Sequence, residues 1–66
     1  MSNETIGHFA GQVWQLLHSQ GAQSVPAIKK AVSAPDDIVL AAIGWLARED
    51  KLNFSKSART LTISLR

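Results

Sequence analysis

Residues 38–55, "IVLAAIGWLAREDKLNFS", decide the fold of this chain. In the first part of the stretch apolar residues recur at helical spacing. The period then changes to two, so that Leu52 and Phe54 alternate with polar residues. A period near 3.6 indicates an amphipathic helix, whereas strict alternation indicates a strand with one buried face. The stretch therefore predicts a helix over about residues 35–49, followed closely by a strand over about residues 51–55.

The C-terminal end repeats the alternating pattern. Apolar side chains occupy every second position of Leu61–Leu65, which predicts a second strand over about residues 60–65. The polar segment Lys56–Arg59 connects the two strands and makes the pair a hairpin. Because an isolated hairpin is only marginally stable in water, we expect this one to pack on the helices. Val25 could lend a short third strand.

Helical spacing also marks the N-terminal part. Ser2 or Asn3 can cap a first helix over about residues 4–19, since short polar side chains accept hydrogen bonds from the free amides of the first turn. Gly21 predicts the end of this helix, because glycine adopts the left-handed cap conformation without strain. The expected buried stripe consists of Ile6, Phe9, Ala10, Val13 and Leu17, widened by Trp14 and Leu16.

The middle of the chain carries two helix start signals. Ser24 predicts the N-cap of a short helix over about residues 25–32, with a proline in the first turn, where its missing amide is tolerated. Ser33 begins a second capping pattern at the start of the third helix, with Asp36 three residues on. Two helices separated by so tight a turn must cross steeply, which is a helix-turn-helix unit. The alternative is that "SAPDD" is simply a loop. The second helix is expected to turn Ile28, Ala31 and Val32 inward.

A helix, a helix-turn-helix and a C-terminal hairpin, in that order, are typical of a winged helix-turn-helix domain. We therefore predict an α+β fold that is mainly α, with three helices followed by a β-hairpin wing, in one domain over residues 1–66. A chain of 66 residues buries so small a core that a second subunit is the expected stabiliser.

Two segments carry a family resemblance as well as a pattern. "AGQVWQLL" (Ala10–Leu17) and "AAIGWLAREDKLNF" (Ala41–Phe54) resemble the signature segments of a family of very short bacterial and archaeal winged-helix proteins, long classed as a domain of unknown function. The resemblance covers nearly the whole chain, and the block from Gly44 to Lys51 is its most specific part. It implies a winged-helix fold, homodimerisation and a DNA-binding role, and it brings no catalytic residues. The wing tip, "SKSAR", lacks the glycine often seen in such hairpins.

Composition narrows the cellular setting. The chain has no cysteine, so it has no disulfide and no thiolate metal site, which fits a reducing cytoplasm. The N-terminal segment lacks the basic and apolar regions of a signal peptide. The uncharged run from Ile38 to Ala47 is far shorter than the ~20 residues that cross a bilayer. We therefore expect a cytoplasmic protein with no membrane contact.

The third predicted helix is apolar on more than one face. Its core side spans roughly 140° of the helix surface and consists of Ile38, Val39, Ala42, Ile43 and Leu46. Leu40 and Gly44 lie on the other side, and Trp45 lies between the two. Because so small a chain cannot bury such a helix alone, we predict a homodimer. The expected interface residues are Trp14, Leu40, Gly44 and Trp45. The alternative is one exposed leucine beside an ordinary core tryptophan.

Charge bears on whether the fold binds DNA. A formal net charge of +2 is only mildly basic. The N-terminal residues of a recognition helix enter the major groove, and here they include Asp36 and Asp37, which repel phosphate. Basic residues occur instead on the second helix and the wing tip, where phosphate contacts are expected: Lys29, Lys30, Lys56 and Arg59. Scattered lysines of this kind are also typical of an ordinary solvated surface.

Two functions therefore stay open. The first is a small homodimeric DNA-binding protein associated with transcription. The second is a dimeric protein-interaction module that has the winged fold and does not bind DNA. The candidate partners are a second copy of the chain, double-stranded DNA and another protein.

An enzyme is not expected. His8 and His18 lie too far apart along one helix to share a metal, and neither has a serine or cysteine nucleophile placed by a motif. The chain also has no glycine-rich phosphate loop. We expect no catalytic residue, no metal and no cofactor.

Overall fold

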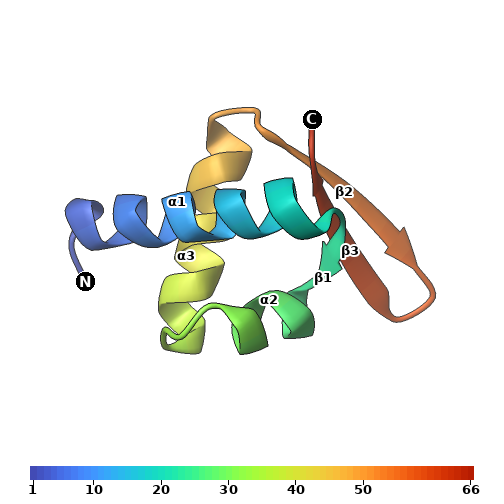
Figure 1. Ribbon diagram of the computed structural model, residues 1–66, viewed down its shortest axis with the longest axis horizontal. Helices are drawn as coiled ribbons and strands as arrows, with labels where there is room; N and C mark the ends of the chain where they lie inside the picture. Colours follow the sequence, from blue (N-terminus) through green and yellow to red (C-terminus); the bar gives the residue numbers. More distant parts are fainter.

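The computed structural model describes residues 1–66 as three helices and a three-stranded antiparallel sheet (Figure 1). The strand order in the sheet is β1-β3-β2, so the strand nearest the C-terminus lies in the middle. This is the winged helix-turn-helix arrangement predicted from the sequence. The elements in chain order are α1 (Asn3–Gln20), β1 (Gln23–Ser24), α2 (Val25–Ala31), α3 (Asp36–Arg48), β2 (Leu52–Ser57) and β3 (Thr60–Leu65).

The helix ends follow local sequence signals. The Ser2 hydroxyl accepts a hydrogen bond from the Thr5 amide at 3.2 Å, and the Ser24 hydroxyl accepts one from the Ala27 amide at 3.2 Å. Gly21 ends α1 with a φ of 79°, a conformation that side chains disfavour. The predicted caps of α1 and α2 are thus confirmed. The third strand expected at Val25 occurs immediately before it, because Val25 already belongs to α2.

The predicted serine cap of α3 is wrong. Helix α3 begins at Asp36, and the N-cap position is Pro35, with no side-chain hydrogen bond to the first turn. The Val39 amide donates the first helical hydrogen bond to the Pro35 carbonyl, at 3.1 Å. Ser33 therefore lies two positions before the cap, too far along the chain to reach the free amides. One of those amides, that of Ile38, donates instead to the carboxylate of Asp37 at 2.8 Å.

The core lies where α1 crosses α3 and where the sheet packs against the helices (Figure 1). Strand β3 packs on α1 and α2, whereas β2 packs on α3. The prediction that Ala31 faces inward is wrong: Ala31 is exposed, and Ile28 is the buried residue of α2, because no other element covers the flank that holds Ala31. Val32 follows as the C-cap and is buried, as predicted. The buried residues are Ala10, Val13, Leu17, Ile28, Val32, Val39, Ala42, Ile43, Leu46, Leu52 and Ile63.

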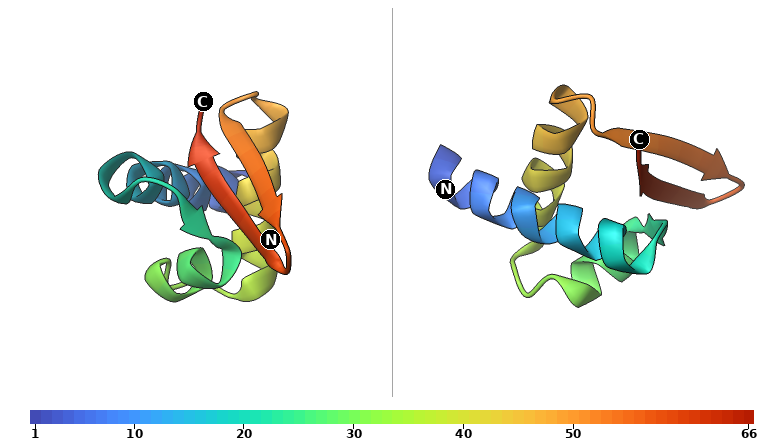
Figure 2. Two further views of the ribbon diagram at one scale, coloured as in Figure 1. Left: turned by 90° about the vertical axis from the view of Figure 1, so that its right-hand side faces the viewer. Right: turned by 45° about the horizontal axis from the view of Figure 1, so that its top comes forward.

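The wing departs from its predicted burial pattern. Leu52 is buried at the start of β2, but Phe54, on the same face and opposite Ile63, is 48% exposed. Alternation had predicted that Phe54 would be buried. The physical reason is that β2 is an edge strand that projects beyond the helices, so only its beginning is covered (Figure 2).

The wing turn contains two residues, Ala58 and Arg59, between the paired Ser57 and Thr60. Ala58 has a φ of 53°, so an alanine occupies a position that usually holds glycine in tight hairpins. The expected wing therefore forms without the glycine, at some cost in backbone strain. None of the three helices combines the length and the hydropathy that a membrane span requires.

Candidate interaction surfaces

The side of α3 that faces away from the core is apolar along most of its length. Leu40 is 50% exposed, and Gly44, one turn later, is exposed. Apart from its chain neighbours and the nearby helix backbone, no atom lies within 4 Å of the position that a Cβ of residue 44 would occupy. Charged side chains occur only near the two ends of this outer face, as Asp37 in the first turn and Arg48 in the last. We call Asp37, Leu40, Ala41, Gly44 and Arg48 the outer face of α3.

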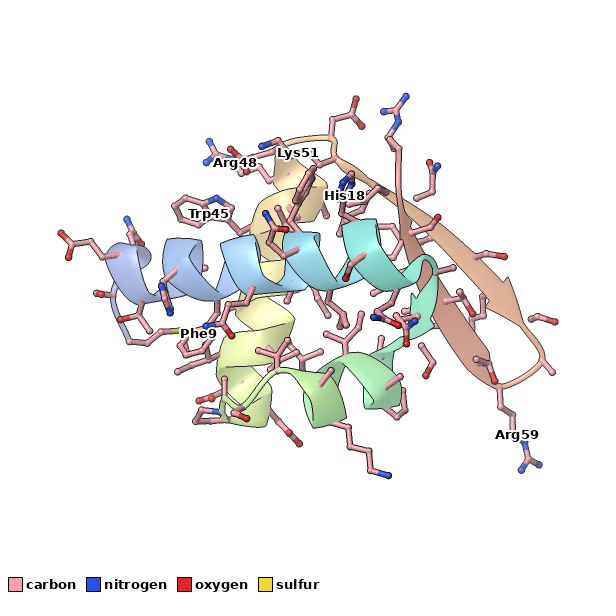
Figure 3. All side chains as sticks on the ribbon, viewed as in Figure 1. Phe9, His18, Trp45, Arg48, Lys51 and Arg59 are labelled. Carbon is pink, nitrogen blue, oxygen red and sulfur yellow. The ribbon has the colours of Figure 1, made fainter.

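Trp45 does not share this face with Leu40. Five helical steps place the two side chains about 140° apart around the helix axis. Trp45 is 37% exposed and lies against α1, with its Cζ2 atom 3.9 Å from the Cβ position of Gly7 (Figure 3). Three of the residues predicted to share one dimer interface, Leu40, Gly44 and Trp45, therefore occupy two flanks of α3, and the fourth, Trp14, lies on α1.

The two tryptophans line one groove between α1 and the C-terminal half of α3. The groove has a volume of about 260 Å³. Trp14 lies on one wall and stacks on the His18 ring, with the ring centroids 4.8 Å apart and the planes 12° from parallel. The lining residues are Gly7, Ala10, Gly11, Trp14, Gln15, Trp45, Leu46, Glu49 and Lys51. Lys51 and Glu49 form an ion pair of 3.7 Å, so the charged end of the groove has no net charge.

The four basic candidates differ in availability. Lys29 is partly buried, and its ammonium group lies 3.6 Å from the carboxylate of Asp36, so part of its charge is already neutralised. Lys30, Lys56 and Arg59 are exposed and make no ion pair. Arg59 points away from the body of the molecule at the wing tip (Figure 3).

The first turn of α3 is acidic, which is unusual for a helix that reads DNA. Asp36 and Asp37 are both exposed there. Carboxylates stabilise a helix N-terminus through the helix dipole, so their position has a structural explanation. The same carboxylates repel the phosphates of a groove, and the next exposed residues, Leu40 and Gly44, offer no hydrogen-bond donor from a side chain to a base edge.

Comparison with known proteins identifies the family. The model of a winged helix-turn-helix domain family, DUF2582, matches residues 1–65. The chain belongs to this family. An uncharacterized protein of Methanocaldococcus jannaschii, MJ1608, is 39% identical to it over 64 residues, which span 92% of this chain and 90% of the relative. Membership agrees with the fold described above and with the resemblance seen in the two signature segments. Neither the family description nor the name of the relative assigns an activity.

The two histidines lie apart on α1. A hydrogen bond of 3.1 Å joins the His8 ring to the Gln12 side chain, and His18 lies under Trp14. No group of three or more histidine, cysteine, aspartate or glutamate side chains lies close enough together to hold a metal ion.

The sequence did not predict the groove between α1 and α3, nor the exposure of Phe54. The groove had a visible signal, since Gly7 and Gly11 are one helical turn apart and leave space on the same side of α1. The exposure of Phe54 had no such signal, because alternation shows which face a residue is on and cannot show whether another element covers that face.

Proposed function

We propose that the protein is a homodimeric interaction module of winged-helix fold, in which the outer face of α3 binds a second copy of the chain. The observation that carries the proposal is the apolar outer face itself, with a half-exposed leucine one turn before an unobstructed glycine. In a domain that binds DNA with this helix, the same positions would hold basic or amide side chains that bond to bases.

The shape of the outer face of α3 favours close packing against a second helix. Two helices pack with their axes 8–10 Å apart, depending on the side chains at the crossing point. Gly44 permits an approach at the short end of that range, and Leu40 then packs against the partner helix. This burial would add apolar area that the small core of 11 residues lacks.

Charge also favours a second copy in antiparallel orientation. The first turn of α3 holds Asp36 and Asp37, and the last turn holds Arg48. In an antiparallel pair the first turn of each helix lies beside the last turn of its partner, so the carboxylates approach the guanidinium group. The two helix dipoles oppose each other in the same arrangement, which is also favourable.

The oligomeric state tests the proposal. Sedimentation equilibrium at micromolar concentration should give twice the 7.1 kDa mass of the chain. Leu40→Glu should raise the dissociation constant roughly 100-fold or more, because it buries an unpaired carboxylate. Since Leu40 is half-exposed in the single subunit, the variant should keep its helical circular dichroism. Gln12→Glu, which adds the same charge at an exposed site on α1, is the control and should stay dimeric. A monomeric wild-type protein would refute the proposal.

A second candidate function, DNA binding through the phosphate backbone, is favoured by one observation. Lys30, Lys56 and Arg59 are exposed and free of carboxylate partners on α2 and the wing, the elements that flank the groove-reading helix in this fold. In this case the protein would be a DNA-binding protein associated with transcription, with affinity set mainly by charge and dimer geometry.

Titration of duplex DNA at several salt concentrations separates the two functions. Backbone binding should weaken with salt, with a log–log slope of about −0.9 per phosphate neutralised. Replacing Lys56 and Arg59 together by alanine should then flatten the slope. If no duplex binds even at low salt while the protein remains dimeric, only the interaction module stands.

A further inference from the structure

Strand β2 has an open edge. It is the outermost strand of the sheet, it is six residues long, and every residue after Leu52 is exposed. No proline or bulge interrupts its pairing with β3, which runs in register from Leu52 to Ser57. Natural proteins usually block such an edge, because its unpaired backbone groups can extend the sheet. The single charge on this strand, Lys56, is its only protection.

The hydrogen-bond pattern shows which backbone groups face the open side. The Arg66 amide donates to the Lys51 carbonyl at 3.0 Å, just outside the pair Leu52–Leu65. Leu52 and Leu65 therefore form a non-hydrogen-bonded pair, and such pairs alternate along an antiparallel ladder. Phe54 and Lys56 occupy equivalent positions. The amides and carbonyls of Leu52, Phe54 and Lys56 consequently point away from β3.

From this geometry we propose that β2 pairs with β2 of a second copy, antiparallel and centred on Phe54, to form one sheet of six strands. In this register the backbone amide and carbonyl of Phe54 form hydrogen bonds with those of Phe54 of the partner subunit. The backbone of Leu52 forms the corresponding pair of hydrogen bonds with Lys56 of the partner subunit. All three outward-facing residues of each strand are then used. A shift by two residues in either direction leaves one of them unpaired.

The same register also suits the side chains of Phe54 and Lys56. Each half-exposed Phe54 acquires the partner's Phe54 as a cross-strand neighbour on the same face of the sheet, and aromatic pairs of this kind stabilise a sheet. Each Lys56 faces a leucine and not another lysine, so like charges are kept apart. For these two reasons we expect the strand that pairs with the open edge of β2 to be β2 of a second copy.

The open edge lies on the same side of the molecule as α3. Helix α3 packs on β2. The left view of Figure 2 shows α3 beside the β2 edge of the sheet, with β1 at the opposite edge. The connection between them is tightly held: the Lys51 amide donates to the Leu46 carbonyl at 3.1 Å, and Arg66 forms an ion pair with Asp50. The inference rests on the proposed self-association and deepens it, because it requires one twofold axis to relate both the α3 faces and the β2 edges.

Disulfide trapping tests the register, since the chain has no cysteine of its own. In the proposed sheet Asn53 lies directly opposite Ser55 of the partner subunit, within the range of Cα separations that a disulfide spans. Mixing Asn53→Cys with Ser55→Cys, which leaves Phe54 intact, should give a cross-linked heterodimer under mild oxidation. Neither variant alone should cross-link efficiently, because each cysteine is two residues away from its own copy. Phe54→Cys alone should cross-link to itself.

A backbone variant tests the hydrogen bonds. The Lys56 amide faces outward, so Lys56→Pro removes a donor from the open edge and spares the β2–β3 ladder. It should raise the dimer dissociation constant at least tenfold relative to the control Lys56→Ala, which loses the same charge and keeps the amide.

The outcomes separate the two proposals. If the wild-type protein is dimeric and Leu40→Glu dissociates it, but the mixed variants fail to cross-link and the proline variant matches its control, the strand pairing is wrong and the α3 interface stands. Cross-linking of Asn53→Cys with itself would also overturn the register. A monomeric wild-type protein would overturn both.

Discussion

Replacement of Gly44 by alanine separates the stability of one subunit from the stability of the dimer. In the single subunit the new methyl group has no neighbour within 4 Å apart from its chain neighbours and the nearby helix backbone, so it causes no clash. Glycine in a helix interior costs about 1 kcal/mol relative to alanine. The subunit should therefore become more stable by about 1 kcal/mol, which corresponds to a rise in Tm of roughly 4–8 °C for a domain of this size.

The dimer should respond with the opposite sign. If the two α3 helices approach each other at Gly44, the added methyl groups overpack the contact, and overpacking of this kind typically costs about 1–3 kcal/mol in all. This cost corresponds to an increase of roughly 5- to 150-fold in the dissociation constant. One substitution thus strengthens the fold and weakens the assembly.

Urea unfolding at protein concentrations below and above the dissociation constant, combined with sedimentation equilibrium, measures both effects. Gly11→Ala is the matched control: Gly11 is an exposed helical glycine whose added methyl group is equally unobstructed, but it lies on α1 and lines the groove, away from the outer face of α3. It should give the same gain of about 1 kcal/mol and leave the dissociation constant unchanged. Equal behaviour of the two variants in both assays would show that α3 does not cross its partner at Gly44.

Three further predictions concern the fold and are measured by urea unfolding of the single subunit. Ser24→Ala should cost about 1 kcal/mol because it removes the α2 cap, whereas Ser33→Ala should change stability by less than about 0.5 kcal/mol because Ser33 caps nothing; equal losses would contradict the cap assignment. Ile63→Ala should cost about 2–5 kcal/mol, since Ile63 is fully buried in the central strand, and a loss below 1 kcal/mol would be inconsistent with that burial. Ala58→Gly should stabilise the protein by about 1 kcal/mol by relieving the positive φ of the wing turn, and a destabilised variant would refute this.

The order and type of the elements could be predicted from the sequence because their signals are local. A serine hydroxyl reaches the amide three residues ahead, and a glycine accepts a left-handed φ, whatever else surrounds them. The change of period after Asp50 likewise depends only on which side each residue faces along its own helix or strand. These signals placed the helices and the hairpin within a few residues of their observed bounds, and they identified an outer face of α3 that is apolar.

The burial of particular residues and the grouping of the surfaces depended on tertiary structure. Ser33 has the sequence pattern of an N-cap, but Pro35 holds that position in the structure. Phe54 has the spacing of a buried residue, but it lies on a part of β2 that the helices do not cover. Trp45 and Leu40 lie on one helix, but α1 packs beside Trp45, so that Trp45 lines a groove, whereas Leu40 remains on the outer face. A side chain loses contact with water only when another element lies over it. The relative placement of helices and strands is set by the packing of the whole core, so no short segment of the sequence contains it.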